Sequence, residues 1–70
     1  MSTKNVFCVT IHYQDERGRS AIALNIEAPD DVKARSIAVT QDAQSFRDND
    51  TKVPKVEYCE IKFVCRVITN

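Results

Sequence analysis

The stretch Ala28-Pro29-Asp30-Asp31 decides how this chain folds, because it separates a strand-like pattern from a helical one. Proline cannot donate a hydrogen bond to a strand ladder, so Pro29 ends the strand before it. Asp30 is suited to cap the first free amides of a helix, and Asp31 suits the positive end of its dipole. Lys33 stands where the glutamate of a capping box would be, so the box is incomplete. We expect a helix to begin here.

Two segments before this junction, residues 6–13 and 21–28, alternate between apolar and polar side chains as half-buried strands do. The expected inward set is Phe7, Val9, Ile11 and Tyr13 in the first segment, and Ile22, Leu24 and Ile26 in the second. The opposite face of the first segment carries Val6, Cys8, Thr10 and His12. The polar link between them contains Gly18, the single glycine, which suits a hairpin turn that needs a positive φ.

The helix is apolar on two sides and should end near Arg47, with Asn49 in the left-handed position after it. The expected sheet-facing stripe consists of Ala34, Ile37, Ala38, Gln41 and Ser45. A second stripe consists of Val32, Val39, Ala43 and Phe46. Because one small sheet covers only one side of a helix, we expect Val39 and Phe46 to form a partner-binding surface; the alternative is that Phe46 folds back over the sheet edge.

A long last strand, residues 56–68, follows Pro54 and is about twice the usual length. Alternation places Cys59, Ile61, Phe63, Cys65 and Val67 inward. It places Val56, Tyr58, Glu60, Lys62, Val64, Arg66 and Ile68 outward.

These elements predict an α+β fold of β-β-α-β type, with residues 1–70 forming a single domain. A right-handed helical crossover that returns the last strand beside the first gives an antiparallel three-stranded sheet of order 2-1-3, with the helix on one face. The alternative order, 1-2-3, would make the last strand parallel to the second. We favour the order 2-1-3.

Size and charge limit the choice of partners. A domain of 70 residues buries only about 60% of its unfolded surface, so a partner interface would contribute much of the stability, and we expect a homodimer. Ten basic and ten acidic residues give no net attraction to a polyanion. The chain shows neither a signal-peptide pattern nor a membrane span, so we expect a cytoplasmic protein with no membrane partner.

The sequence indicates no catalytic, cofactor-binding or metal-binding residue. Cys59 and Cys65 are six residues apart on the expected strand, about 20 Å, and Cys8 is expected on the opposite face, so we expect three reduced thiols. Cys8 and His12 are about 13 Å apart along their strand, too far for an activated nucleophile. A single glycine rules out glycine-rich phosphate loops.

The open sheet face is the other candidate surface. It is expected to present His12, Thr10, Tyr58, Lys62, Val64 and Arg66. An aromatic ring between cations suits base stacking, so the alternative function is nucleic-acid binding by a regulatory protein. The glutamates nearby dilute the positive field, which leaves two other interpretations of this surface: an ordinary half-solvated sheet face, or a protein contact at Tyr58, Lys62, Val64 and Arg66.

The run Glu27-Ala28-Pro29-Asp30-Asp31-Val32-Lys33-Ala34-Arg35-Ser36-Ile37-Ala38, a strand leading into a capped helix, resembles small phage- and prophage-encoded β-β-α-β proteins of the anti-CRISPR type. The resemblance implies a small, cofactor-free protein that occupies a surface of a larger machine, and it assigns no functional residue. We therefore expect a non-enzymatic protein-interaction module. Nucleic-acid binding is the second hypothesis and a small enzyme the third.

Overall fold

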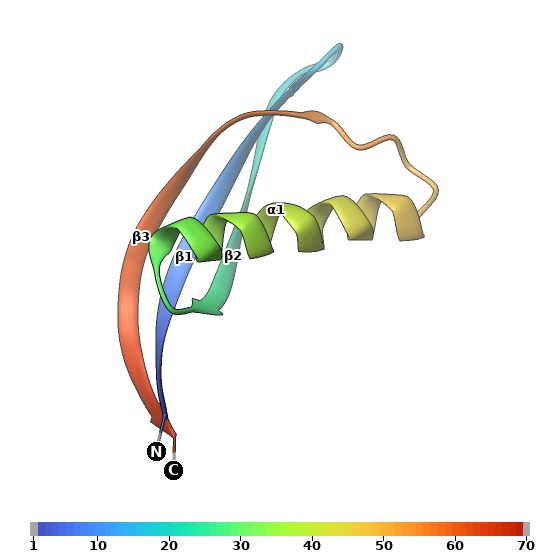
Figure 1. The fold of residues 1–70 in the computed structure, drawn as a ribbon. Coiled ribbons are helices and arrows are strands. Elements are labelled where there is room, and N and C mark those ends of the chain that lie inside the picture. The colour runs from blue at the N-terminus through green and yellow to red at the C-terminus, as the bar shows by residue number, and fades with distance from the viewer. Residues whose placement is uncertain (1, 70) are drawn as a thin grey trace.

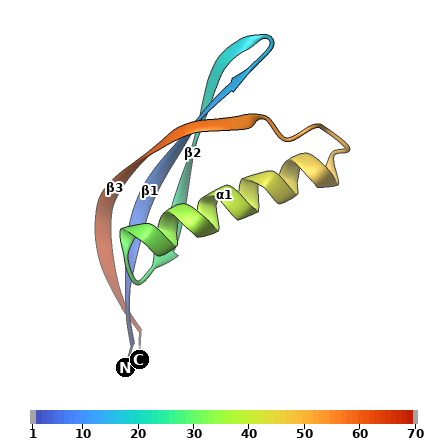
Figure 2. The same cartoon turned by 45° about the horizontal axis from the view of Figure 1, so that its top comes forward.

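The computed structural model describes residues 2–69, with side chains for residues 3–68. Strands β1 (Ser2–Asp15) and β2 (Gly18–Ala28) are followed by helix α1 (Asp31–Asp48) and strand β3 (Lys55–Thr69). The three strands form one antiparallel sheet in the order β2-β1-β3, which confirms the predicted α+β fold and its 2-1-3 order. Figure 1 shows α1 crossing in front of the strands, and Figure 2 shows the same layering from a second side.

Local chemistry explains the turns at each end of β2. Only Glu16 and Arg17 separate β1 from β2, and Gly18 takes a φ of 123°, as the hairpin requires. At the other end, the carboxylate of Asp30 accepts a hydrogen bond from the backbone N–H of Lys33 at 2.7 Å. The predicted N-cap is confirmed, and it fixes where α1 begins.

The end of α1 differs from the prediction in one residue. Asp50, rather than Asn49, has the positive φ, at 54°. Asn49 keeps a φ of −93° because its side-chain amide and its backbone N–H both donate to the carbonyl of Ser45, at 2.9 and 3.2 Å. The left-handed turn is therefore displaced by one position.

The core lies between α1 and the sheet face that α1 covers, called the helix face below. All four predicted β1 residues are buried there, and Val9 and Ile11 are completely enclosed. Burial of an aliphatic side chain of this size stabilises a fold by about 1.5–3 kcal/mol. Ala34 and Ala38 of α1 are also fully buried, so α1 approaches the strands closely.

The core differs from the prediction in both partner elements. Ile22 is 40% exposed because the hairpin end of the sheet extends past α1, whereas Ile26 is buried as predicted. On the helix, Gln41 and Ser45 are exposed, and Asp42 is buried in their place. Ala34, Ala38 and Asp42 are buried at intervals of four residues. Phe46 continues this spacing and packs against the core, so it lies on the sheet-facing side of α1.

Two irregularities divide β3 into three parts. Val6 opposes Cys65 while the next residue, Phe7, opposes Phe63, so Val64 is an extra residue in β3. Glu57 is a second extra residue, because His12 opposes Tyr58 and Tyr13 opposes Val56. Between these bulges β3 pairs regularly with β1.

The bulges overturn part of the predicted alternation. Beyond Val64, Cys65 and Val67 oppose Val6 and Lys4 on the open face, the sheet face opposite α1. Arg66 and Ile68 oppose residues of the helix face instead, so the predicted inward and outward sets are exchanged. Val56 also moves to the helix face, where it packs against the core.

Candidate functional site

Toward the hairpin end of the sheet, the open face carries a cluster of three side chains, His12, Tyr58 and Glu60. His12 of β1 lies opposite Tyr58 of β3, and their rings stack with centroids 4.2 Å apart at 12°. Nε2 of His12 is 2.9 Å from Oε1 of Glu60, close enough for an ion pair, yet it makes no hydrogen bond of normal geometry within the described part of the chain. We call these residues the open-face cluster.

Ring stacking limits what the open-face cluster can bind. Tyr58 is 47% exposed, but one face of its ring is covered by His12. Glu60 places a carboxylate beside the histidine, and Glu57 pairs with Arg19 at 3.4 Å. The acidic and basic groups on this part of the open face therefore largely offset each other.

Lys62 is a cation on the open face of β3 that makes no ion pair among residues 3–68. It lies on the open face opposite Cys8, two residues from Glu60, and its side chain is exposed. Among residues 3–68, no carboxylate is within ion-pair distance of its ammonium group. Lys62 is available to an external carboxylate.

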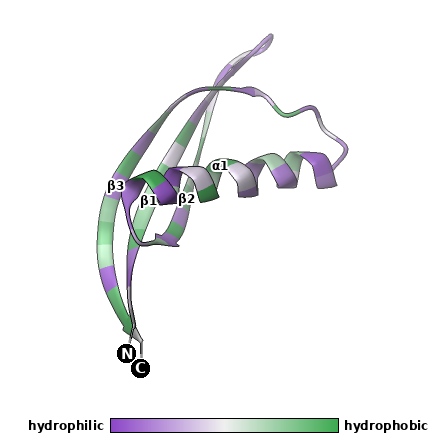
Figure 3. Ribbon diagram, viewed as in Figure 1, coloured by the Kyte–Doolittle hydropathy of each residue, from purple (hydrophilic) through white to green (hydrophobic). Residues whose placement is uncertain are grey.

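Exposed apolar side chains gather on β3 around and beyond the bulge at Val64. Phe63 is 54% exposed, Val64 52% and Ile68 62%, and we call these three residues the β3 apolar patch. Phe63 contacts Phe7 edge-on with ring centroids 5.8 Å apart, which holds its ring at the border of the core. Figure 3 shows hydrophobic residues along this part of β3, which is an edge strand of the sheet.

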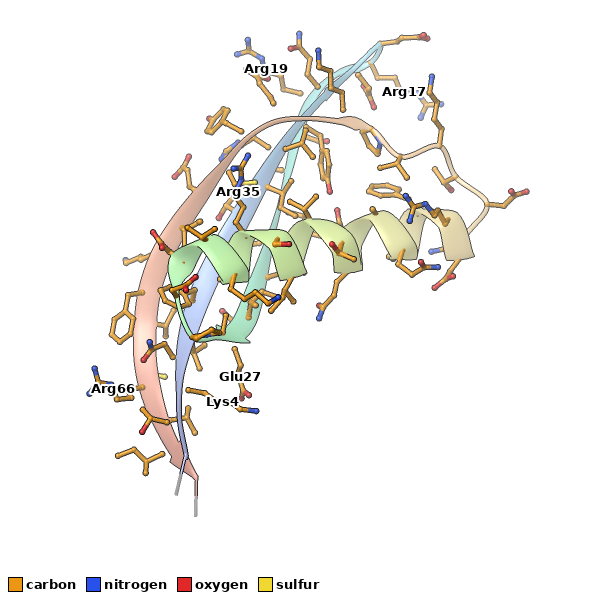
Figure 4. All side chains as sticks on the ribbon, viewed as in Figure 1. Lys4, Arg17, Arg19, Glu27, Arg35 and Arg66 are labelled. Atoms are coloured by element: carbon orange, nitrogen blue, oxygen red, sulfur yellow. The ribbon has the colours of Figure 1, made fainter. Side chains whose placement is uncertain are left out.

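The predicted partner-binding residues are distributed over several surfaces. Tyr58 and Lys62 lie on the open face, and Val64 occupies a bulge next to them. Arg66 opposes Asn5, which places it on the helix face, contrary to the prediction. Its side chain extends away from β1 (Figure 4).

Val39 and Phe46 do not form the fully exposed pair that the helical periodicity suggested. Both are half-buried and pack against the core, and Phe46 meets Tyr13 edge-on with centroids 5.8 Å apart. Val39 also lines a shallow groove of about 370 Å³ between α1 and β3. The remaining lining residues of this groove are Val32, Arg35, Ser36, Thr40 and Val56.

A buried polar pair joins α1 to β1, and the sequence pattern gave no sign of it. The hydroxyl of Tyr13 donates a short hydrogen bond to Oδ2 of Asp42, and both side chains are buried. Burial, reinforced by the Asp42 carboxylate, raises the pKa of the Tyr13 hydroxyl well above its ordinary value of 10.0. The pair is sealed within the core, which suits a structural role.

The cysteines also lie differently from the prediction. Cys65 opposes Val6 on the open face and therefore shares that face with Cys8, while Cys59 opposes Ile11 on the helix face. All three are free thiols. Within the described residues, no group of three or more His, Cys, Asp or Glu side chains is placed to hold a metal ion.

Comparison with known proteins assigns no family. No family model, no curated protein and no solved structure matches this chain. Helix α1, the helix of the described residues, contains too few apolar residues to cross a membrane.

Proposed function

We propose that this chain is a non-enzymatic protein-interaction module that binds through β3. The observation that carries the proposal is the position of β3 at the edge of the sheet, with the β3 apolar patch and the unpaired Lys62 on the same strand. An edge strand offers unpaired backbone groups to an extended segment of another chain. Exposed apolar side chains beside such an edge add affinity and select the partner.

The resemblance to phage- and prophage-encoded β-β-α-β proteins supports a more specific proposal. In this form, the module acts in the cytoplasm as an inhibitor that occupies a surface of a larger machine. The small size of the chain is compatible with such a role, because occupying a surface requires shape and charge but no reacting group.

A direct test is capture of partners from the native host with the tagged chain and with two matched variants. Val64→Asp places a charge in the β3 apolar patch, while Ala23→Asp places one on β2, the opposite edge strand. We expect proteins identified by mass spectrometry to be retained by the parent chain and by the Ala23 variant, and lost by the Val64 variant. Equal capture by both variants would refute binding through β3.

Nucleic-acid binding is the second candidate, favoured by the exposed Tyr58 ring and by Lys62 on the same open face. Nuclease treatment before capture separates the two functions, because a nucleic-acid binder would lose its co-purifying molecules. Titration with fluorescent single-stranded oligonucleotides at low and high salt provides the direct measurement. Salt-sensitive binding that Tyr58→Ala abolishes would replace the protein-interaction proposal.

A further inference from the structure

The exposed edge of β3 between its two bulges has a charge pattern that is complementary to itself. Residues 58–63 are the regular part of the strand, and this segment carries one acid, Glu60, and one base, Lys62. Both side chains are exposed, and both lie on the open face, opposite Thr10 and Cys8 respectively. Glu60 and Lys62 are therefore equidistant from Ile61, one on each side.

We propose that β3 pairs antiparallel with β3 of a second copy of this chain, about a two-fold axis at Ile61. Residues that face each other across such an axis have numbers that sum to a constant, here 122. Glu60 then opposes the second copy's Lys62, and Lys62 opposes the second copy's Glu60. The inference rests on the proposed function, since it assigns a partner to the same β3 surface.

Charge selects this register over its neighbours. Side chains alternate between faces, so only shifts of two residues keep the two helix faces on one side of the joined sheet. A shift in one direction places Glu60 against the second copy's Glu60. A shift in the other direction places Lys62 against the second copy's Lys62. Like charges directly opposite each other destabilise a strand pair, so both neighbouring registers are disfavoured.

The apolar side chains agree with the same register. On the helix face, Ile61 opposes Ile61 of the second copy, and Phe63 opposes the second copy's Cys59. Phe63 is 54% exposed in the single chain, so this pairing covers apolar surface that the monomer leaves in water. The bulges at Glu57 and Val64 disrupt the strand on both sides and confine the regular pairing of the two copies to residues 59–63.

Charge reversal tests the inference directly. Sedimentation equilibrium from about 1 to 200 µM should show a monomer–dimer equilibrium for the parent chain. Lys62→Glu or Glu60→Lys alone should weaken dimerisation by about tenfold or more, because each puts like charges in both symmetric pairs. The double variant E60K/K62E should restore the parent affinity. Lys52→Glu, in the loop before β3, is the matched control and should leave dimerisation unchanged.

Several results would overturn the inference. A parent chain of monomer mass at every concentration would exclude self-pairing. A dimer that is insensitive to both single reversals, or a double variant that is no better than the singles, would place the interface elsewhere. Thermal unfolding confirms that each variant is folded. Hydrogen exchange of a peptide covering residues 59–63 should slow with increasing concentration; exchange that is independent of concentration would contradict the register.

The proposed function and this inference can fail separately. Loss of partner capture in the Val64 variant together with a monomeric parent chain would keep the function and remove the self-pairing. A dimer that depends on Glu60 and Lys62 but captures no other protein would support the self-pairing and remove the proposed binding of another protein.

Discussion

Tyr13 and Asp42 are 29 residues apart in the sequence, yet their side chains meet in a buried hydrogen bond that joins the central strand to the helix. The tyrosine ring also packs edge-on against Phe46. Tyr13 of β1 therefore makes both a polar and an aromatic contact with the C-terminal half of α1.

Removing the Tyr13 hydroxyl should destabilise the fold. Tyr13→Phe leaves a buried carboxylate without its donor, and such a loss costs about 1–3 kcal/mol. Urea unfolding followed by circular dichroism measures the change. The double variant Y13F/D42L should recover most of the stability, because it removes both polar groups; a double variant that is less stable than Tyr13→Phe would show that Asp42 has a further role.

High pH should destabilise the protein through the same residue. The folded chain holds the Tyr13 proton more tightly than the unfolded chain, whose tyrosine has the ordinary pKa of 10.0. The associated stability is complete below pH 10.0 and is lost as the pH rises from there toward the raised pKa of the folded state. Urea unfolding between pH 8.5 and 11 should show a steeper loss for the parent chain than for Tyr13→Phe. Parallel curves would contradict this assignment.

Charges introduced along α1 should distinguish core positions from surface positions. Ile37→Asp and Phe46→Asp each place a carboxylate against the core, and we expect a loss of about 2 kcal/mol or more for each. Val32→Asp is the matched control, because Val32 is 75% exposed. Thermal unfolding of the three variants provides the comparison. A Phe46 variant as stable as the Val32 variant would show that Phe46 is not part of the core, and Phe46 would again be a candidate partner-binding residue.

The three cysteines should differ in reactivity and in their contribution to stability. Cys65 is exposed, whereas Cys8 and Cys59 are half-buried and Cys59 packs against the core. In a native-state titration with a thiol reagent, Cys65 should react first. Ser substitution should cost on the order of 1 kcal/mol at Cys59 and less at Cys65. Loss of partner binding by a cooperatively folded triple variant would show that the thiols act in function.

The fold class, strand order and β1 core could be predicted from the sequence because regular alternation and a capped helix start define them. The bulges at Glu57 and Val64 could not, because an extra residue leaves the apolar spacing of β3 unchanged in the sequence while it reverses the faces. Asp42 was missed for a different reason. A carboxylate is expected in water, and only the distant Tyr13 makes its burial favourable.

The candidate site was predicted only in part. Tyr58 and Lys62 lie on the open face as expected, since they fall within the regular part of β3. Arg66 lies beyond the bulge at Val64 and is therefore on the face opposite to the predicted one. Glu60 was missed as a member of the open-face cluster, although its position two residues from Tyr58 on the same face was visible in the sequence.

The bulges also determine where the chain tolerates a change in length. Removing Val64 would leave Cys65 opposite Val6 and every later residue on its present face, because the extra residue has no counterpart in β1. Removing Ile61 would instead turn Lys62 and Phe63 over, which places Lys62 on the helix face opposite Val9, or would force the strand to slip past β1. Single-residue deletions and insertions should therefore be accommodated at Glu57 and Val64 and rejected between them.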